Sequence, residues 1–306
     1  MDKKAESLSE IIELIKNEFK SLTREGDIQN LWFRAERDFI PLESKVPLED
    51  SFNAVPFTPL LPNAYRCYGR VEESDYEKVY KNTKDIEDNL KAEFSRNSMM
   101  FLNQNRIENN DWNNYFLMQH YGLKTRLLDW TESALIAIYF AIKDNTKKED
   151  AKIWILDPHH LNRLTYKKYA NINSTMIYFP QTSKKKSLFD EDKKFDIDEF
   201  CRMYLKMDFE LNKKAFPLAI YPYLFDERMK EQKSCFTIFG NEIDGLFNNP
   251  NKRHFLKSIV IDGSKKSDIK KELKWLGISE ESVYPGLSSN CKSIQEKYYT
   301  DYLEKI

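Results

Sequence analysis

The stretch over residues 118–142 constrains the fold most, because it places charged side chains inside an apolar frame and then becomes wholly apolar. Arg126 and Asp129 lie three positions apart in it, flanked by leucines and a tryptophan. Charged side chains are rarely buried without a partner, because desolvating an isolated charge is costly. The two residues are therefore expected either to form a structural ion pair or to face a ligand.

Residues 134–142 are apolar on every side, which predicts a buried helix rather than an amphipathic one. Asp129 or Thr131 is expected to be its N-cap, because the side-chain oxygen of either can accept from the first amide groups of the helix. These amides and the positive end of the helix dipole would favour an anion nearby. They would point back toward three side chains: His120, Tyr121 and Arg126.

The composition excludes several familiar protein classes. The chain has 306 residues, of which 41% are hydrophobic, enough for one large core or two smaller ones. Its four cysteines are scattered, so neither a disulfide framework nor a metal site is predicted. Among the eight glycines there is no dinucleotide-binding fingerprint, and Leu246 stands where a P-loop would need lysine.

The charge balance argues against recruitment of nucleic acid by an overall basic field. The formal net charge is −1, although the three lysines at 184–186 offer a local phosphate contact. No apolar run approaches the length needed to span a membrane, and the first residues lack an apolar signal core. We therefore expect a cytoplasmic protein with no membrane association; a nucleic-acid partner is possible but not indicated by the charge, and the sequence does not specify a protein partner.

The order of the expected elements favours an α+β fold with a mixed or antiparallel sheet flanked by helices, because strands and helices alternate irregularly. Residues 1–27 are expected to be an N-terminal helical lead-in, followed by one α+β domain over 28–306. Helices are expected at 5–23, 83–97, 111–121, 134–142, 265–275 and 288–303. Strands are expected at 29–36, 152–156, 218–221, 235–239 and 258–261, with a long loop at 40–65.

Residues 119–131 read Gln-His-Tyr-Gly-Leu-Lys-Thr-Arg-Leu-Leu-Asp-Trp-Thr. This stretch resembles the signature of the FRG domain, a bacterial family named for a Phe-Arg-Gly motif. That motif is present as Phe33-Arg34-Ala35, with alanine in place of glycine. The segment 228–237 also resembles the family, with Ser234 in place of a glycine. The resemblance implies a setting in bacterial stress or phage defence.

The order of these motifs is also similar to that of the ADP-ribosyltransferase fold. This analogy implies an enzyme that uses NAD as its substrate, for transfer or for hydrolysis. Arg34 would hold the phosphates, Thr131 and Tyr139 would belong to the middle element, and the late position would fall on Glu231 or Gln232. A glutamine at that position would make catalysis doubtful. His120 is a second candidate catalytic residue, as a general acid or base.

The alternative is a non-catalytic module that senses a nucleotide or nucleic acid. Three arginines would then form an anion pocket without a catalytic carboxylate: Arg34, Arg126 and Arg228. Tyr121, Asp129 and Thr237 are further candidate ligand contacts under either hypothesis. Each candidate also has a structural interpretation: Arg34 as the partner of Glu36, His120 as a hydrogen-bonded helix end, and Tyr139 as a core residue.

Overall fold

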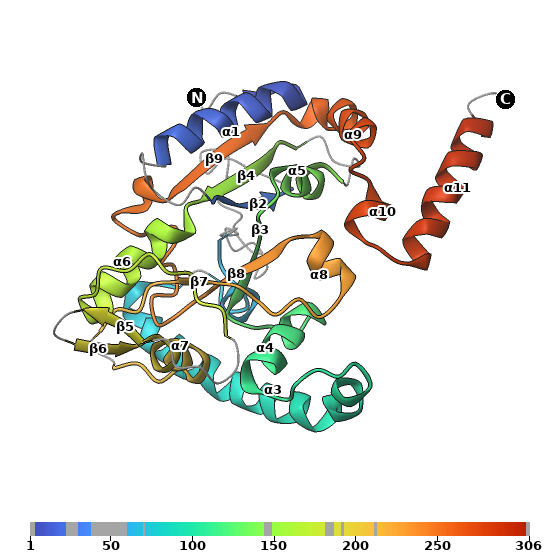
Figure 1. The fold of residues 1–306 in the computed structure, drawn as a ribbon. Helices are drawn as coiled ribbons and strands as arrows, with labels where there is room; N and C mark the ends of the chain where they lie inside the picture. The colour runs from blue at the N-terminus through green and yellow to red at the C-terminus, as the bar shows by residue number, and fades with distance from the viewer. Residues whose placement is uncertain are drawn as a thin grey trace, which may run out of the picture.

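The computed structural model describes residues 4–22, 30–37, 60–69, 71–143, 149–180, 187–190, 193–210 and 213–303. Within these residues the fold is α+β (Figure 1). The strands are β1 (Lys4–Ala5), β2 (Trp32–Glu36), β3 (Leu127–Thr131), β4 (Ala151–Leu156), β5 (Ser187–Asp190), β6 (Lys193–Asp196), β7 (Leu218–Ile220), β8 (Ser234–Ile238) and β9 (Leu256–Ile261). The α-helices are α1 (Leu8–Leu22), α2 (Asn63–Arg66), α3 (Tyr76–Gln104), α4 (Asp111–His120), α5 (Ala134–Ile142), α6 (Pro158–Ala170), α7 (Ile197–Lys206), α8 (Glu227–Glu231), α9 (Lys266–Trp275), α10 (Glu280–Val283) and α11 (Leu287–Leu303). Short 3₁₀ turns cover Glu73–Asp75, Lys252–His254 and Gly263–Lys265.

Seven of the described strands form one mixed sheet in the order β1-β9-β4-β2-β3-β8-β7. Its strand pairs are antiparallel except β1 with β9, which run parallel with Lys4 opposite Val260. The strand β1 was not expected from the sequence, and it joins the N-terminal helix α1 directly to the sheet. The expected mixed sheet flanked by helices is therefore confirmed.

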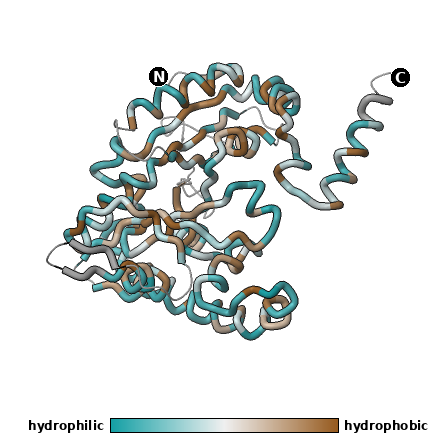
Figure 2. The backbone as a smooth tube through the Cα atoms, viewed as in Figure 1, coloured by the Kyte–Doolittle hydropathy of each residue, from teal (hydrophilic) through white to brown (hydrophobic). Residues whose placement is uncertain are grey.

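Alternate residues of each strand pack into different cores, because successive side chains of a strand point to opposite faces. In β4, Ile153 and Ile155 join the cluster formed with α1, α5 and α9, whereas Trp154 and Leu156 join a cluster on the other face. A third cluster lies where α4, α6 and α7 cover β7 and β8. In Figure 2, brown hydrophobic residues gather along α5 and along the strands of the seven-stranded sheet.

The helix α5 is almost wholly buried, as its apolar sequence predicts. Its N-cap is Ser133, whose hydroxyl accepts from the amide of Ile136 at 3.4 Å. The expectation that Asp129 or Thr131 caps this helix is therefore wrong. Both residues lie in β3, a strand that is buried at every position except Asp129, and the chain turns at 132–133 before the helix begins.

The free edge of β7 is covered by side chains instead of a further strand. Asn162 of α6 donates to the carbonyl of Ala219 at 2.9 Å and accepts from its amide at 2.7 Å. Tyr178 forms an isolated bridge beside Ile220. A buried asparagine thus supplies the donor and acceptor that a neighbouring strand would supply, which protects the edge.

Several elements differ from those expected. The helix α6 was not among the expected helices; it begins at Pro158, since Asp157 caps it and proline suits the first position of a helix. The helices α7 and α8 were not expected, and α3 is longer than the helix expected at 83–97. Most of the loop at 40–65 and the lysines at 184–186 lie outside the described residues. No described helix has the length and apolarity needed to span a membrane.

Candidate functional site

The signature segment begins at the end of α4. Asn110 caps the start of this helix by accepting from the amide of Asn113 at 2.9 Å. Gly122 follows its C-cap with a φ of +87°, a left-handed conformation that glycine adopts without a steric penalty. The expected end of the helix at this glycine is confirmed. The turn leads the chain into β3, which lies between β2 and β8 in the sheet.

Arg126 lies in the interior, where Glu87 of α3 is its ionic partner. Its Nε lies 3.0 Å from Glu87 Oε2, and its terminal nitrogens donate to the carbonyls of Phe239 and Tyr204. Burial acts to lower the pKa of Arg126, but Glu87 together with Tyr115, Tyr65 and Tyr80 raises that pKa above its ordinary value. The guanidinium is thus a structural group, and its ionic partner is not Asp129 as considered from the sequence.

Arg34 and Asp129 lie where β2 and β3 separate. The two strands pair at one position, Phe33 with Thr131, and Arg34 Nη1 donates to the carbonyl of Asp129 at 2.7 Å. The Asp129 carboxylate accepts from Gln119 at 2.9 Å, and Gln119 in turn accepts from Thr125 at 2.5 Å. Three signature residues therefore form one hydrogen-bonded chain that ends beside Arg34.

Arg66 of α2 lies close to this network. Burial and then the positive charge of Arg34 lower the pKa of Arg66 to about 10. Burial also lowers the pKa of Arg34, against the opposing charges of Asp129 and Glu36. The region where β2 and β3 separate thus contains two guanidinium groups, Arg34 and Arg66, and two carboxylates, Asp129 and Glu36.

His120 and Tyr121 end α4 near the start of α8. His120 Nε2 lies 2.7 Å from a carboxylate oxygen of Asp226, which is the N-cap of α8. Tyr121 is exposed, and its ring packs edge-on against those of Phe101 and His120. His120 is therefore joined to a specific carboxylate through its side chain.

The remaining candidates are dispersed. Glu231 is exposed at the end of α8, and the next residue, Gln232, donates to the carbonyl of Val283 at 3.1 Å. Arg228 is exposed and lies over the ring of Tyr284, 5.3 Å from its centroid. Three others are buried: Thr237 accepts from Trp130, Thr131 donates to the carbonyl of Gln232, and Tyr139 of α5 packs in the core.

The structure does not bring the predicted arginines and His120 into one hollow. Arg126 is held by Glu87, Arg34 contacts Asp129, Arg228 lies on Tyr284 and His120 contacts Asp226. The helix-dipole argument for an anion beside His120 and Arg126 also fails, because α5 begins only after Ser133. A concave surface with an aromatic wall lies elsewhere in the described part of the chain.

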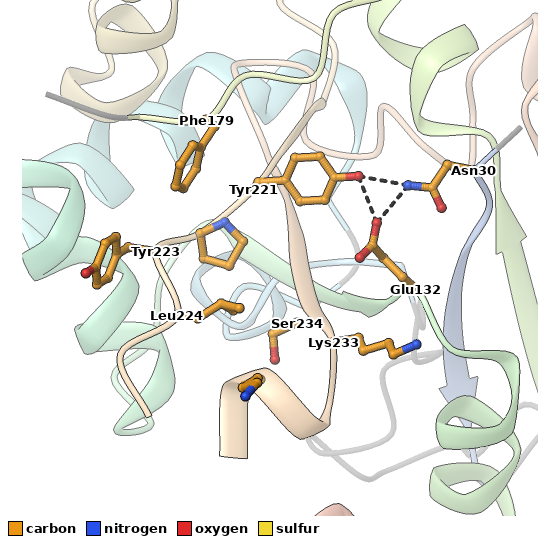
Figure 3. A pocket seen from close by; sticks show the side chains of 10 residues that line it. Asn30, Glu132, Phe179, Tyr221, Tyr223, Leu224, Lys233 and Ser234 are labelled. Atoms are coloured by element: carbon orange, nitrogen blue, oxygen red, sulfur yellow. Dashed lines mark hydrogen bonds between the residues drawn. The ribbon is translucent and has the colours of Figure 1, made fainter. Parts of the chain in front are cut away.

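This concave surface is a pocket of about 790 Å³ at the end of β3 and the start of β8 (Figure 3). Its apolar wall consists of Phe179, Tyr221, Pro222, Tyr223 and Leu224. Its polar groups are Asn30, Glu132, Lys230, Lys233 and Ser234. Apolar and aromatic walls with a few convergent polar groups are typical of small-molecule sites, and the volume lies within their usual range of roughly 300–1,000 Å³.

Glu132 is held by two neighbours inside this pocket. Its Oε1 accepts from Tyr221 at 2.8 Å and from Asn30 at 2.7 Å, and Asn30 also contacts the Tyr221 hydroxyl at 2.8 Å. Burial and then Glu132 raise the pKa of Tyr221, so the hydroxyl stays protonated and donates to the carboxylate. No described side chain or amide bonds to Oε2, which turns away from Tyr221 and Asn30 in Figure 3.

Two lysines of the pocket lie on the α8 segment. Lys230 belongs to α8, and Lys233 follows it with a φ of 46°. A left-handed conformation at a residue other than glycine costs about 1–2 kcal/mol, and such strain is common at functional sites. The pocket therefore combines an oriented carboxylate, aromatic rings and two ammonium groups, which together suit a ligand with a planar ring, a hydroxyl group and an anionic group.

Only part of this site could have been found in the sequence. Glu132 follows the signature directly and is thus adjacent to the predicted residues. The sequence alone, however, does not distinguish a glutamate in an exposed turn from one in a pocket. Asn30, Tyr221 and Phe179 come from distant segments, and only the folded sheet brings them together.

The comparison with protein families agrees with the signature at residues 119–131. Residues 58–150 match the family described as FRG domain, so the chain contains an FRG domain. Of the pocket residues, only Glu132 lies within the matched segment, which also includes the Gln119–Asp129 network and Arg126. No curated protein matches the chain. No solved structure matches it either.

Proposed function

We propose that this FRG-domain protein binds a nicotinamide dinucleotide in the pocket around Glu132 and cleaves the bond between nicotinamide and ribose. The observation that carries the proposal is the orientation of Glu132. Tyr221 and Asn30 hold one oxygen of its carboxylate, and the other has no partner among the described residues of an aromatic-walled pocket.

The chemistry requires a fixed anion close to the reacting carbon. When the C–N bond breaks, nicotinamide leaves with the electron pair and the ribose carbon develops positive charge. A carboxylate already oriented toward that carbon stabilises this charge without reorganising. Water then supplies the oxygen that bonds to the ribose carbon, and the released proton passes to Glu132 or to solvent. Transfer would replace water by a nucleophile of another molecule.

The walls of the pocket suit the rest of the ligand. The rings of Phe179 and Tyr223 offer faces for a nicotinamide or adenine ring, since planar bases stack on aromatic side chains. Lys230 and Lys233 offer positive charge to the pyrophosphate. In this proposal Glu132 has the role that the motif order assigned to Glu231 or Gln232.

The test is nicotinamide release from NAD by the purified chain, measured by chromatography. We expect Glu132→Gln, which keeps the shape but removes the charge, to lower the rate by about 10²–10³-fold. The matched control is Glu296→Gln on α11, an exposed glutamate outside the pocket, which should retain the wild-type rate. Loss of activity in Glu231→Gln with full activity in Glu132→Gln would assign the carboxylate to the position that the motif order indicated.

Binding measurements on the same purified protein distinguish an enzyme from a nucleotide-sensing module. Calorimetric binding of NAD without release of nicotinamide, weakened in Tyr223→Ala, would identify a nucleotide-sensing domain without catalysis. Neither binding nor release would mean that the pocket serves another ligand. A role in stress or phage defence rests on the family alone, and it predicts that cellular NAD falls on phage challenge in cells with the intact chain but not in cells with Glu132→Gln.

A further inference from the structure

We propose that His120 is a positioning residue, which with Thr131 holds helix α8 at both ends and thereby keeps Lys230 and Lys233 at the pocket. His120 does not line the pocket. The argument begins with the length of α8. A five-residue helix is not stable in isolation, because nucleating a helix is costly and so few residues cannot repay it. Contacts with the rest of the fold must therefore hold it.

The first anchor is at the N-terminal end of α8. One carboxylate oxygen of Asp226 accepts from the amide of Met229 at 2.8 Å and so caps the helix. The other oxygen lies 2.7 Å from His120 Nε2. The side chain of His120 is 11% exposed and that of Asp226 is 39% exposed, so the contact is shielded from water mainly on the His120 side. One carboxylate therefore joins the end of α4 to the beginning of α8.

The second anchor is at the C-terminal end. The Thr131 hydroxyl donates to the carbonyl of Gln232 at 2.7 Å, and the amide of Glu132 donates to the carbonyl of Lys233 at 3.2 Å. These bonds fix the turn in which Lys233 has its left-handed backbone. They also tie that turn to the backbone of Glu132, so Glu132 and Lys233 are held in position relative to each other.

Between the anchors, Met229 is buried in the core and fixes the rotation of the helix. The segment that carries Leu224, Lys230 and Ser234 is thus held on three sides, and all three residues line the pocket. The side chains of both polar anchors come from the signature segment: His120 is its second residue and Thr131 is its last. This explains why a histidine capable of acid–base chemistry occurs in the signature yet lies outside the pocket.

The direct test is amide hydrogen exchange of residues 227–234. Asp226→Ser keeps a good helix cap but is too short to reach His120. We expect His120→Ala and Asp226→Ser to exchange at least about tenfold faster in this segment, because each loses a hydrogen bond to a charged group. His120→Gln, whose amide nitrogen can replace imidazole Nε2, should restore slow exchange. The matched control is His254→Ala, remote from α8. Unchanged exchange in Asp226→Ser would overturn the proposal.

The kinetic arm rests on the proposed reaction with NAD. We expect His120→Ala to raise KM for NAD about tenfold with kcat little changed, as for lost binding that is equal in the ground and transition states. A fall in kcat at constant KM, not restored by His120→Gln, would show that His120 takes part in the reaction and would also overturn the proposal. If the wild-type chain does not turn over NAD, the proposed function fails, and the exchange experiment still decides the role of His120.

Discussion

Glu87 and Arg126 form an ion pair in the interior of the protein, with Arg126 Nε 3.0 Å from Glu87 Oε2 and both side chains at most 1% exposed. Tyr115 donates to Glu87 at 2.6 Å, and Glu87 and Tyr115 both contact the backbone amide of Arg126. The pair therefore fixes the chain immediately before β3 to helix α3. It positions the strand that carries the last five residues of the signature.

Glu87→Gln is expected to lower the free energy of unfolding by about 3–5 kcal/mol, because it leaves the Arg126 charge buried without its partner. Urea denaturation of the purified variant measures the change. The control is Glu93→Gln on the same helix, whose pair with Arg96 is exposed and should contribute less than about 1 kcal/mol. A similar small loss in both variants would show that Glu87 and Arg126 are not coupled in this way.

Asp244 should make the protein less stable as the pH rises. Burial raises the pKa of Asp244 from 3.8 to about 6, against the opposing effects of Lys252 and Asn248. The folded state therefore binds more protons than the unfolded state between these two values, and stability falls as the pH rises through this window. We expect Asp244→Asn to be more stable than the wild type by about 1–2 kcal/mol at pH 8 and nearly equal at pH 4.

The measurement is urea unfolding of both proteins at the two pH values. Asn248 donates to Asp244 at 2.7 Å, and an asparagine oxygen at position 244 can still accept this bond. The variant thus changes the charge and little else. Equal stability of variant and wild type at pH 8 would contradict the raised pKa.

Lys233→Gly should weaken the binding of NAD without lowering the stability of the fold. Glycine adopts the left-handed conformation of this position without strain, so the folded state gains about 1 kcal/mol, offset in part by the greater freedom of glycine in the unfolded chain. The same change removes an ammonium group from the pocket. We expect thermal stability equal to or slightly above that of the wild type, and about tenfold weaker calorimetric binding of NAD, as for the loss of a charge-assisted contact. Unchanged affinity would exclude Lys233 from the ligand site.

Arg34→Ala tests whether NAD binds in the pocket around Glu132 or at Arg34, the phosphate-binding residue that the motif order implied. Because Arg34 donates to the carbonyl of Asp129 where β2 and β3 separate, we expect a loss of about 1.5–3 kcal/mol in stability. Binding of NAD to the folded variant should remain within about threefold, less than the loss of one hydrogen bond would cause. Strongly weakened binding at unchanged stability would instead support Arg34 as a phosphate ligand.

Local patterns predicted the elements that depend on neighbouring residues. The apolar run at 134–142 predicted a buried helix, Gly122 predicted the end of α4, and the β-branched and aromatic stretches predicted β4, β7, β8 and β9. The short strand β1 could not be recognised in the same way, because two residues carry no periodicity. Its existence depends on its pairing with Val260 and Ile261.

The site was harder to predict because its residues are brought together only by the sheet. Nothing local distinguishes Glu132 from the many solvated glutamates of this chain. Its hydrogen-bond partners come from distant segments, Tyr221 directly after β7 and Asn30 just before β2. The partner of Arg126 could not be predicted for the same reason, since Glu87 lies 39 positions earlier, on helix α3. Chemically active residue types mark the region of a site, but their partners are determined by the tertiary fold.

The most direct test of the pocket is a crystal structure of the protein with NAD bound. We expect the nicotinamide ring against Phe179 or Tyr223, a ribose oxygen within hydrogen-bond distance of Glu132 Oε2, and the pyrophosphate beside Lys230 and Lys233. A dinucleotide bound beside Arg34 and Asp129, with the pocket around Glu132 empty, would contradict the account.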